Sequence, residues 1–332
     1  MIQGSRVVIF LLLGILILVG LGMFLLLDAV QGRGGPACLD AVAPAPFAGF
    51  WQVAGTPSED EPWAIEYDDE LRIQIDRNPR RIASALPGIT EMVAYLGRGP
   101  ELVAVTPYCD HPADVVSGLP KISVLPFDPE GVLTVSPDLL VVDRRMHRRD
   151  LDVIRERVPN TLLLDTSSSL GHLAQSFTLL HTVIGADKDG TQRLQGWQAR
   201  YETLLADLKR RKPQTPPRVL AVVQWDPLYV LGRGSLIDDL LRACGCVNIA
   251  CDLESDASGV FAEELVLVRR PDWILTPKEL MPDRLRKRWA NVPAVKQGHF
   301  FDASGDDLVR AGPRILDGLE RLADALLGAD AK

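Results

Sequence analysis

Few side chains in this 332-residue chain could carry out catalysis or bind an anion. The best candidate is the loop Gly232–Ser235, which follows an apolar run and precedes a helical segment, as an anion-binding turn does. It lacks the third glycine of a dinucleotide fingerprint and the lysine of a P-loop. The five histidines are scattered without zinc-enzyme spacing, and no Gly-x-Ser-x-Gly elbow occurs. We therefore predict no catalytic residues and no enzyme; an α/β enzyme that uses this loop is the alternative.

Three of the five cysteines lie close together at Cys244, Cys246 and Cys251. They could form one disulfide in an oxidising compartment, bind a soft metal, or stay as buried and free thiols. A zinc site would lack a nearby histidine and a fourth ligand. We predict neither a metal nor a cofactor, and the disulfide state stays open.

A matched pattern recurs in the two halves of the chain. Glu130 lies seven residues before Pro137-Asp138, and Glu264 lies seven residues before Pro271-Asp272. In both cases the acidic residue opens a predicted helix and a buried strand follows the Pro-Asp pair. An acidic first turn also complements the helix dipole, so each glutamate alone has a purely local explanation. Because the pattern is repeated, we expect each half to present one carboxylate at an equivalent place.

The elements around these residues alternate between strands and helices, which predicts two α/β, Rossmann-like lobes with parallel sheets. A β-hairpin is expected at 64–75, at the start of the first lobe. The first lobe should contain strands near 81–86, 102–105, 121–124 and 139–142, with helices from Thr90 to Gly97 and from Pro129. The second lobe should contain strands at 219–223 and 273–276, with helices at 235–244 and 313–327.

A long helix is predicted between the two lobes. Apolar and aromatic residues recur there at three- and four-residue steps, which gives a helix of roughly 39 Å over 187–212. The predicted organisation is a membrane segment at 1–30, a stalk at 31–61, lobes at 62–186 and 213–332, and this backbone helix between the lobes.

The N-terminal segment departs most from a soluble protein. The apolar run from Val7 to Leu27 is long enough to cross about 30 Å of hydrocarbon, and Arg6 precedes it. We interpret it as an uncleaved transmembrane anchor that leaves the body in the periplasm or outside the cell. A cleaved signal peptide and a lipid on Cys38 are the alternatives, although Cys38 lacks the leucine of a lipobox.

The charge of the chain argues against a nucleic-acid partner. Its net charge is −8 and its pI is near 5.2, and no stripe of lysine and arginine with interleaved aromatics occurs.

Several landmarks taken in order, from Ile65 to Leu327, resemble the helical-backbone (class III) periplasmic binding proteins of ABC importers, and among them the cobalamin-binding family. The landmarks are Arg81 to Glu91, Val105 to Pro112, Leu119 to Ile122, the two Glu…Pro-Asp elements, Ala243 to Asn248 and Ala311 to Arg314.

The resemblance implies a monomer that binds a corrinoid between its lobes and delivers it to an ABC permease and its ATPase. It implies ligand contacts at Tyr108, Trp225 and Asp306, and permease docking through Glu130 and Glu264. The sequence departs from the cobalamin pocket where two further tryptophans are expected, near Leu125 and Ser258. Haem or a ferric siderophore is the alternative ligand of the same fold.

Overall fold

The structure is a computed structural model that describes residues 50–54, 61–67, 71–123, 126–145, 148–253, 258–276 and 281–328. The predicted anchor at 7–27 and Cys38 lie outside the described residues. Within the described part of the chain, no helix is long and apolar enough to cross a membrane. Residues 44–332 form one compact unit that includes both predicted lobes, and the lobe boundaries stay predictions.

A small antiparallel sheet precedes the parallel sheet of the first lobe in the sequence. It contains β1 (Trp51–Val53), β2 (Trp63–Tyr67) and β3 (Arg72–Ile75), in that order. The hairpin predicted at 64–75 is confirmed as β2 and β3. The segment predicted as a stalk contains one strand, β1. This strand pairs antiparallel with β2 at the edge of the sheet. The hydroxyl of Tyr67 donates to the carbonyl of Leu163 (2.8 Å), which ties this sheet to the first lobe.

The N-terminal lobe is built on a parallel sheet, as predicted, but one of its four strands, at 161–164, was not predicted. The strand order is β5-β4-β6-β7. All residues of β4, β6 and β7 are buried, which explains why these strands are continuous apolar runs without alternation. The predicted strand at 121–124 is reduced to a single bridge between Lys121 and Val105. The bounds are β4 (Ile82–Ser84), β5 (Leu102–Val105), β6 (Leu139–Asp143) and β7 (Thr161–Leu164).

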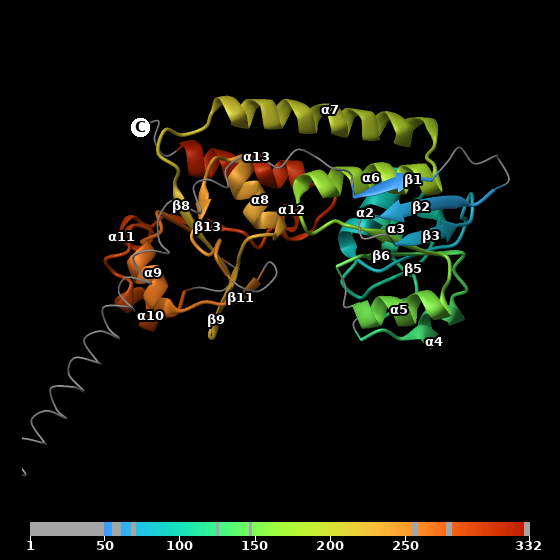
Figure 1. Ribbon diagram of the computed structural model, residues 1–332, viewed down its shortest axis with the longest axis horizontal. Helices are drawn as coiled ribbons and strands as arrows, with labels where there is room; N and C mark the ends of the chain where they lie inside the picture. The colour runs from blue at the N-terminus through green and yellow to red at the C-terminus, as the bar shows by residue number, and fades with distance from the viewer. Residues whose placement is uncertain are drawn as a thin grey trace, which may run out of the picture. The chain divides into compact units, whose positions relative to one another are not determined.

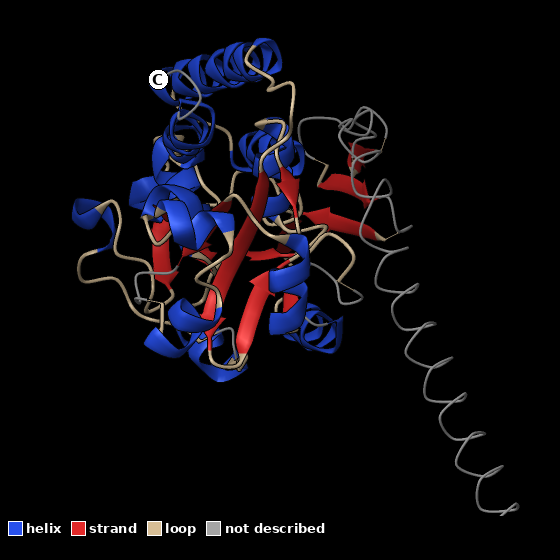
Figure 2. Ribbon diagram, turned by 90° about the vertical axis from the view of Figure 1, so that its left-hand side faces the viewer, coloured by secondary structure: helices blue, strands red, loops and turns tan. Residues whose placement is uncertain are grey.

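Helices lie above and below this sheet in Figure 1, and Figure 2, in which the C-terminal lobe faces the viewer, shows strands enclosed between helices. The first helix, α2, begins at Pro87 and not at Thr90 as predicted, because proline is well suited to the first helical turn. The hydroxyl of Thr90 is buried and donates to Ser84 instead of capping the helix. The helical segments of this lobe are α2 (Pro87–Tyr95), η2 (Gly99–Glu101), α3 (Ala113–Val116), α4 (Pro129–Thr134), α5 (Arg148–Arg157) and α6 (Leu170–Ile184).

The predicted backbone helix is observed as α7 (Lys188–Arg210). Asp187 caps its first turn, and its buried side chains include Leu194, Trp197, Leu204 and Leu208. It packs against α2 and α6 of the first lobe and against α8 and α13 of the second, along the upper edge of Figure 1. The indole Nε1 of Trp197 donates to the carbonyl of Pro313 (2.8 Å). One helix therefore connects the two lobes along its length.

The C-terminal lobe has a mixed sheet, which corrects the prediction of a purely parallel one. The main strand order is β11-β9-β8-β12-β13, and β10 also pairs with β8. The strands β10, β12 and β13 are parallel to their partners, whereas β9 and β11 are antiparallel. Only the short turn at Asp226-Pro227 joins β8 to β9, and such a turn can join only antiparallel strands. The bounds are β8 (Arg218–Trp225), β9 (Leu228–Leu231), β10 (Val247–Asn248), β11 (Ser258–Val260), β12 (Trp273–Thr276) and β13 (Phe300–Asp302).

The helices of this lobe include the two predicted at 235–244 and 313–327. They are observed as α8 (Leu236–Ala243) and α13 (Ile315–Gly328). The shorter helices are α9 (Glu263–Arg269), α10 (Asp283–Arg288), α11 (Pro293–Gln297) and α12 (Asp306–Val309).

Candidate functional site

The carboxyl ends of all four strands in the N-terminal sheet lead into loops or helix starts that contact the C-terminal lobe. In open α/β sheets this edge is where ligands bind. The contacts that follow β4, β5, β6 and β7, in that order, are Gly88 with Ala311, Asp110 with Arg310, Arg145 with Gly234, and Leu170 with Asp239. The boundary between the lobes is therefore the candidate site.

The centre of this boundary holds five charged side chains, which we call the inter-lobe ion cluster: Glu91, Asp110, Asp306, Arg310 and Arg314. Two hydrogen bonds of 2.9 and 2.6 Å join Arg314 to Glu91, whose side chain is 4% exposed. Arg314 also lies 3.7 Å from Asp306. A buried carboxylate requires such a partner, since an unpaired buried charge is strongly destabilising.

Arg310 holds the outer part of the cluster together. Its Nη2 donates to Asp110 (2.9 Å) and its Nε lies 3.1 Å from Asp306. The hydrogen bond from Arg310 lowers the pKa of Asp110 to about 2. Asp110 therefore stays ionised at neutral pH, and the two lobes are joined by opposite charges.

Two of the three predicted ligand contacts lie at this boundary. Tyr108 belongs to the same loop as Asp110 and is 77% exposed, which is unusual for a large aromatic residue. Asp306 is the first residue of α12 and belongs to the ion cluster. Trp225 lies elsewhere: it is 3% exposed, and its ring packs against Trp289 in the core of the second lobe (6.3 Å between centroids). Its side chain presents almost no surface to a ligand in this structure.

The two predicted docking glutamates lie on separate lobes, each as the second residue of a short helix. Glu130 is exposed in α4, and Glu264 in α9 has a side chain that is 70% exposed. Arg288 Nη2 donates to Glu264 (2.5 Å). The pKa of Glu264 is lowered by its own backbone N–H and by Arg288. The two positions are thus equivalent in the fold, but Glu264 already has a cation beside it.

The repeated Pro-Asp pairs have a structural role. Asp138 accepts hydrogen bonds from the backbone amides of Arg80 and Arg81 (2.7 and 2.8 Å), immediately before β4. Asp272 accepts one from the amide of Arg218 (2.9 Å), at the start of β8. Each aspartate fixes the start of the first parallel strand of its lobe. The Pro-Asp part of the repeat is therefore explained by its contribution to the fold.

Polar groups of the loop Gly232–Ser235 already have hydrogen-bond partners within the protein. Ser235 accepts a hydrogen bond from the amide of Asp238 (3.1 Å) and so caps α8, while Arg145 of the other lobe donates to the carbonyl of Gly234 (2.7 Å). The helix start that an anion would need is thus occupied by the chain itself.

The clustered cysteines do not bridge one another. Cys244 and Cys246 are free and buried, whereas Cys251 belongs to a disulfide. Burial raises the pKa of the Cys244 thiol to about 12, and that of Cys246 is raised for the same reason. Such thiols neither ionise nor bind metal readily at neutral pH. Among the described residues, no group of three or more histidine, cysteine or acidic side chains is arranged to hold a metal ion.

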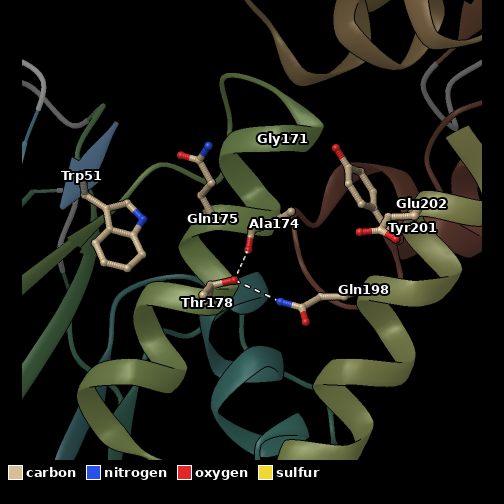
Figure 3. A pocket seen from close by; sticks show the side chains of 8 residues that line it. All are labelled: Trp51, Gly171, Ala174, Gln175, Thr178, Gln198, Tyr201 and Glu202. Carbon is tan, nitrogen blue, oxygen red and sulfur yellow. Dashed lines mark hydrogen bonds between the residues drawn. The ribbon is translucent and has the colours of Figure 1, made fainter. Parts of the chain in front are cut away.

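A hollow of about 490 Å³ lies between α6, α7 and β1 (Figure 3), and its lining residue Gly171 follows Leu170, which contacts the other lobe. Its lining combines Trp51 and Tyr201 with the side-chain amides of Gln175 and Gln198. Gln198 donates to Thr178 (3.2 Å) across the two helices. The hollow contains none of the predicted site residues, so its size alone does not make it the ligand site.

Sequence reasoning missed Glu91, Asp110, Arg310 and Arg314 as residues of the candidate site, although three of them stand in the landmarks. The available signal was Glu91, an acidic residue inside an otherwise apolar helix, which had to meet a cation.

Comparisons with known proteins agree with this architecture. The sequence pattern of the family described as "Periplasmic binding protein" matches residues 82–306. An uncharacterised ABC transporter substrate-binding lipoprotein, YvrC, of Bacillus subtilis is 24% identical over 80% of this chain and 85% of its own length. The periplasmic vitamin B12 binding protein BtuF of Vibrio cholerae superposes with a TM-score of 0.68 at 25% identity, over 77% of this chain and 99% of that one. The periplasmic heme-binding protein RhuT of Roseiflexus superposes with a TM-score of 0.62 at 27% identity, over 75% and 98%.

Proposed function

The chain belongs to the periplasmic binding protein family, and we propose that it is the substrate-binding component of an ABC importer for a corrinoid. It captures the ligand between its two lobes, one per chain, and delivers it to a membrane permease and its ATPase. It acts as a monomer and uses no cofactor. The relatives are substrate-binding proteins, and a solute-binding role requires no catalytic residues.

The observation that carries the ligand site is the exposure of Tyr108 at the carboxyl edge of the first sheet. Tyr108 is 77% exposed and lies two residues before Asp110 of the ion cluster, and its ring offers a flat apolar face with a polar tip. Flat metal chelates bury much area on such rings. The vitamin B12 binding protein of similar fold supports a corrinoid as the first choice.

A haem or a ferric siderophore is the second candidate. The heme-binding protein of similar fold supports it, because its identity and TM-score are close to those of the vitamin B12 binding protein. The same Tyr108 surface would suit the planar ring of haem.

Calorimetric titration of the full-length protein with cobalamin, cobinamide, haemin and ferric siderophores tests the proposal. Binding of a corrinoid with one-to-one stoichiometry is expected. Absence of binding to every one of these ligands at 100 µM, which corresponds to about −5.5 kcal/mol, would remove the transport proposal. Tighter binding of haemin or a siderophore than of both corrinoids would transfer it to the second candidate.

For the permease, we propose docking through the tips of the two lobes. Glu130 is accompanied three residues later by Leu133, which is 46% exposed, and Glu264 in the same way by Leu267, which is 36% exposed. Residues three apart lie on one face of a helix. Each tip therefore presents a carboxylate beside an exposed leucine, which suits a partner surface with a cation next to an apolar patch.

We also propose that the apolar segment 7–27 anchors the protein outside the cytoplasm. The single Arg6 before it and the lipoprotein among the relatives support a membrane-bound form. The intact mass of the native protein distinguishes the alternatives: a mass that starts after residue 27 means cleavage, and an added lipid on Cys38 means a lipoprotein.

A further inference from the structure

The two arginines of the inter-lobe ion cluster are already occupied by carboxylates of the protein. Arg314 is bound by both oxygens of Glu91, and Arg310 is bound by Asp110 and Asp306. An arginine that binds a ligand carboxylate normally offers its planar fork to it. Here that fork is taken before any ligand arrives.

The three carboxylates of the cluster differ in how easily they can leave. Glu91 is 4% exposed within α2, so it cannot move into water without breaking the packing of that helix. Asp306 belongs to the same segment as Arg310, four residues before it. Asp110 is 66% exposed and comes from the opposite lobe. Asp306 is 45% exposed, less than Asp110, so Asp110 is the partner that a ligand can displace most easily.

From this geometry we propose that Asp110 acts as an internal competitor for Arg310, so that the site selects metal chelates with neutral edge groups, such as amides, over chelates that bind through carboxylates. The inference rests on the proposed function and narrows its ligand class. An amide can hydrogen-bond to Asp110 while the ion pair stays in place. A carboxylate must either displace Asp110 from Arg310 or lie beside it with the same charge.

Two further cations reach the same boundary and must be considered. Lys121 Nζ donates to the carbonyl of Cys109 (3.4 Å), and Arg145 donates to Ser168 and Gly234. Either could attract an anionic ligand. If one of them governed ligand charge, the removal of Asp110 would change the affinity for an anionic ligand little.

The test compares two corrinoids that share a ring: cobinamide, whose edge groups are amides, and cobyrinic acid, whose edge groups are carboxylates. Both are titrated into the full-length protein as wild type and as Asp110→Asn. We expect Asp110→Asn to raise the affinity for cobyrinic acid relative to that for cobinamide by about five-fold or more, since an exposed charge pair contributes at this level. Asp110→Ala repeats the measurement, and the melting temperature verifies that each variant is folded.

The matched control is Asp324→Asn, because Asp324 also forms an exposed pair with an arginine, Arg211 (2.8 Å), and is 72% exposed. This change should leave both affinities unaltered. Binding of cobinamide with no gain for cobyrinic acid in either Asp110 variant would overturn the inference and leave the proposed function standing. An equal gain in Asp324→Asn would show a general charge effect and also overturn it. Failure of both corrinoids to bind the wild type would remove the proposed function itself, and the inference with it.

Discussion

The guanidinium of Arg314 binds both carboxylate oxygens of Glu91 across the boundary between the lobes, at 2.9 and 2.6 Å. The two residues are 223 positions apart in the sequence. Glu91 is the more buried partner, so the two sides of the pair are not equivalent.

The first prediction concerns this pair. Arg314→Ala should lower the free energy of unfolding by roughly 3 to 5 kcal/mol, because it leaves the buried carboxylate of Glu91 without its main partner. Glu91→Gln should lower it by less, since Arg314 is 29% exposed and can reach water. Urea unfolding measures both. Arg211→Ala, which breaks an exposed pair, is the control and should lower it by less than about 1 kcal/mol. An Arg314→Ala effect as small as that control would contradict the prediction.

The second prediction is a pH dependence of the Asp110–Arg310 pair. The pKa of Asp110 is about 2 in the folded protein, compared with the ordinary value of 3.8 for an aspartate that lacks the contact with Arg310. A lowered folded pKa means that the stabilisation is present above about pH 4 and is lost as pH falls towards 2. Because Asp110 is largely exposed, the effect should stay below about 1 kcal/mol. The difference in unfolding free energy between wild type and Asp110→Asn should therefore shrink between pH 4 and 2; a difference that stays constant there would show that the pair does not titrate.

The third prediction separates the two aromatic residues that were expected to contact the ligand. Trp225→Ala should lower the free energy of unfolding by about 3 to 5 kcal/mol, because it leaves a cavity beside Trp289. Tyr108→Ala should change stability by less than about 0.5 kcal/mol, since its ring is exposed. If Tyr108 stacks on the ligand, its removal should weaken corrinoid binding by about ten-fold. Thermal unfolding and calorimetry on the same two variants test both parts, and a stable Trp225→Ala protein would contradict the first.

The fourth prediction concerns docking of the lobe tips. Glu130→Ala and Glu264→Ala should each reduce uptake and leave ligand affinity and melting temperature nearly unchanged, since exposed charges contribute little to stability. The double variant should be worse, and reversal to lysine worse again. Leu133→Ser with Leu267→Ser should reduce uptake in the same way. Uptake in cells, with calorimetry on the purified variants, distinguishes docking from binding. Normal uptake by the double glutamate variant would contradict docking through these residues and leave them only a role at the start of a helix.

Arg288 provides an internal comparison for that prediction. It binds Glu264 and also Glu263, the latter at 2.7 Å, so that it can keep Glu263 when Glu264 turns to a partner. Arg288→Ala should therefore strengthen docking through the second lobe, because one competitor for Glu264 is removed. A loss of docking would instead make Arg288 part of the contact surface.

Much of the fold could be predicted because its elements are encoded locally. Continuous apolar runs gave the buried strands β4, β6 and β8, and three- and four-residue spacing gave α7 nearly to its ends. The antiparallel β9 was missed because the turn at Asp226-Pro227 was not interpreted as a hairpin. The apolar run of β8 ends before Gln224, and the pairing of β8 with β9 shifts register between Val222 and Gln224, so the sequence pattern did not show that Trp225 is buried.

The candidate site was harder to predict, because its central contacts are made between distant segments. Arg310 and Asp110 are 200 residues apart, and nothing near either one in the sequence identifies the other. The sequence showed that the Glu…Pro-Asp element is repeated, but it did not show that the glutamate and the aspartate of this element have different roles. The aspartates anchor strands, whereas the glutamates remain exposed and available to a partner.

The contact between Gly88 and Ala311 limits how closely the two lobes can approach each other. A side chain at Gly88 would begin 2.1 Å from the carbonyl oxygen of Ala311, so the lobes touch there backbone to backbone and cannot come closer. If one lobe rocks against the other about this contact, the displacement of an atom grows with its distance from Gly88. Spectroscopic labels beside Gly88 would hardly register that motion, whereas labels far from it would record it in full.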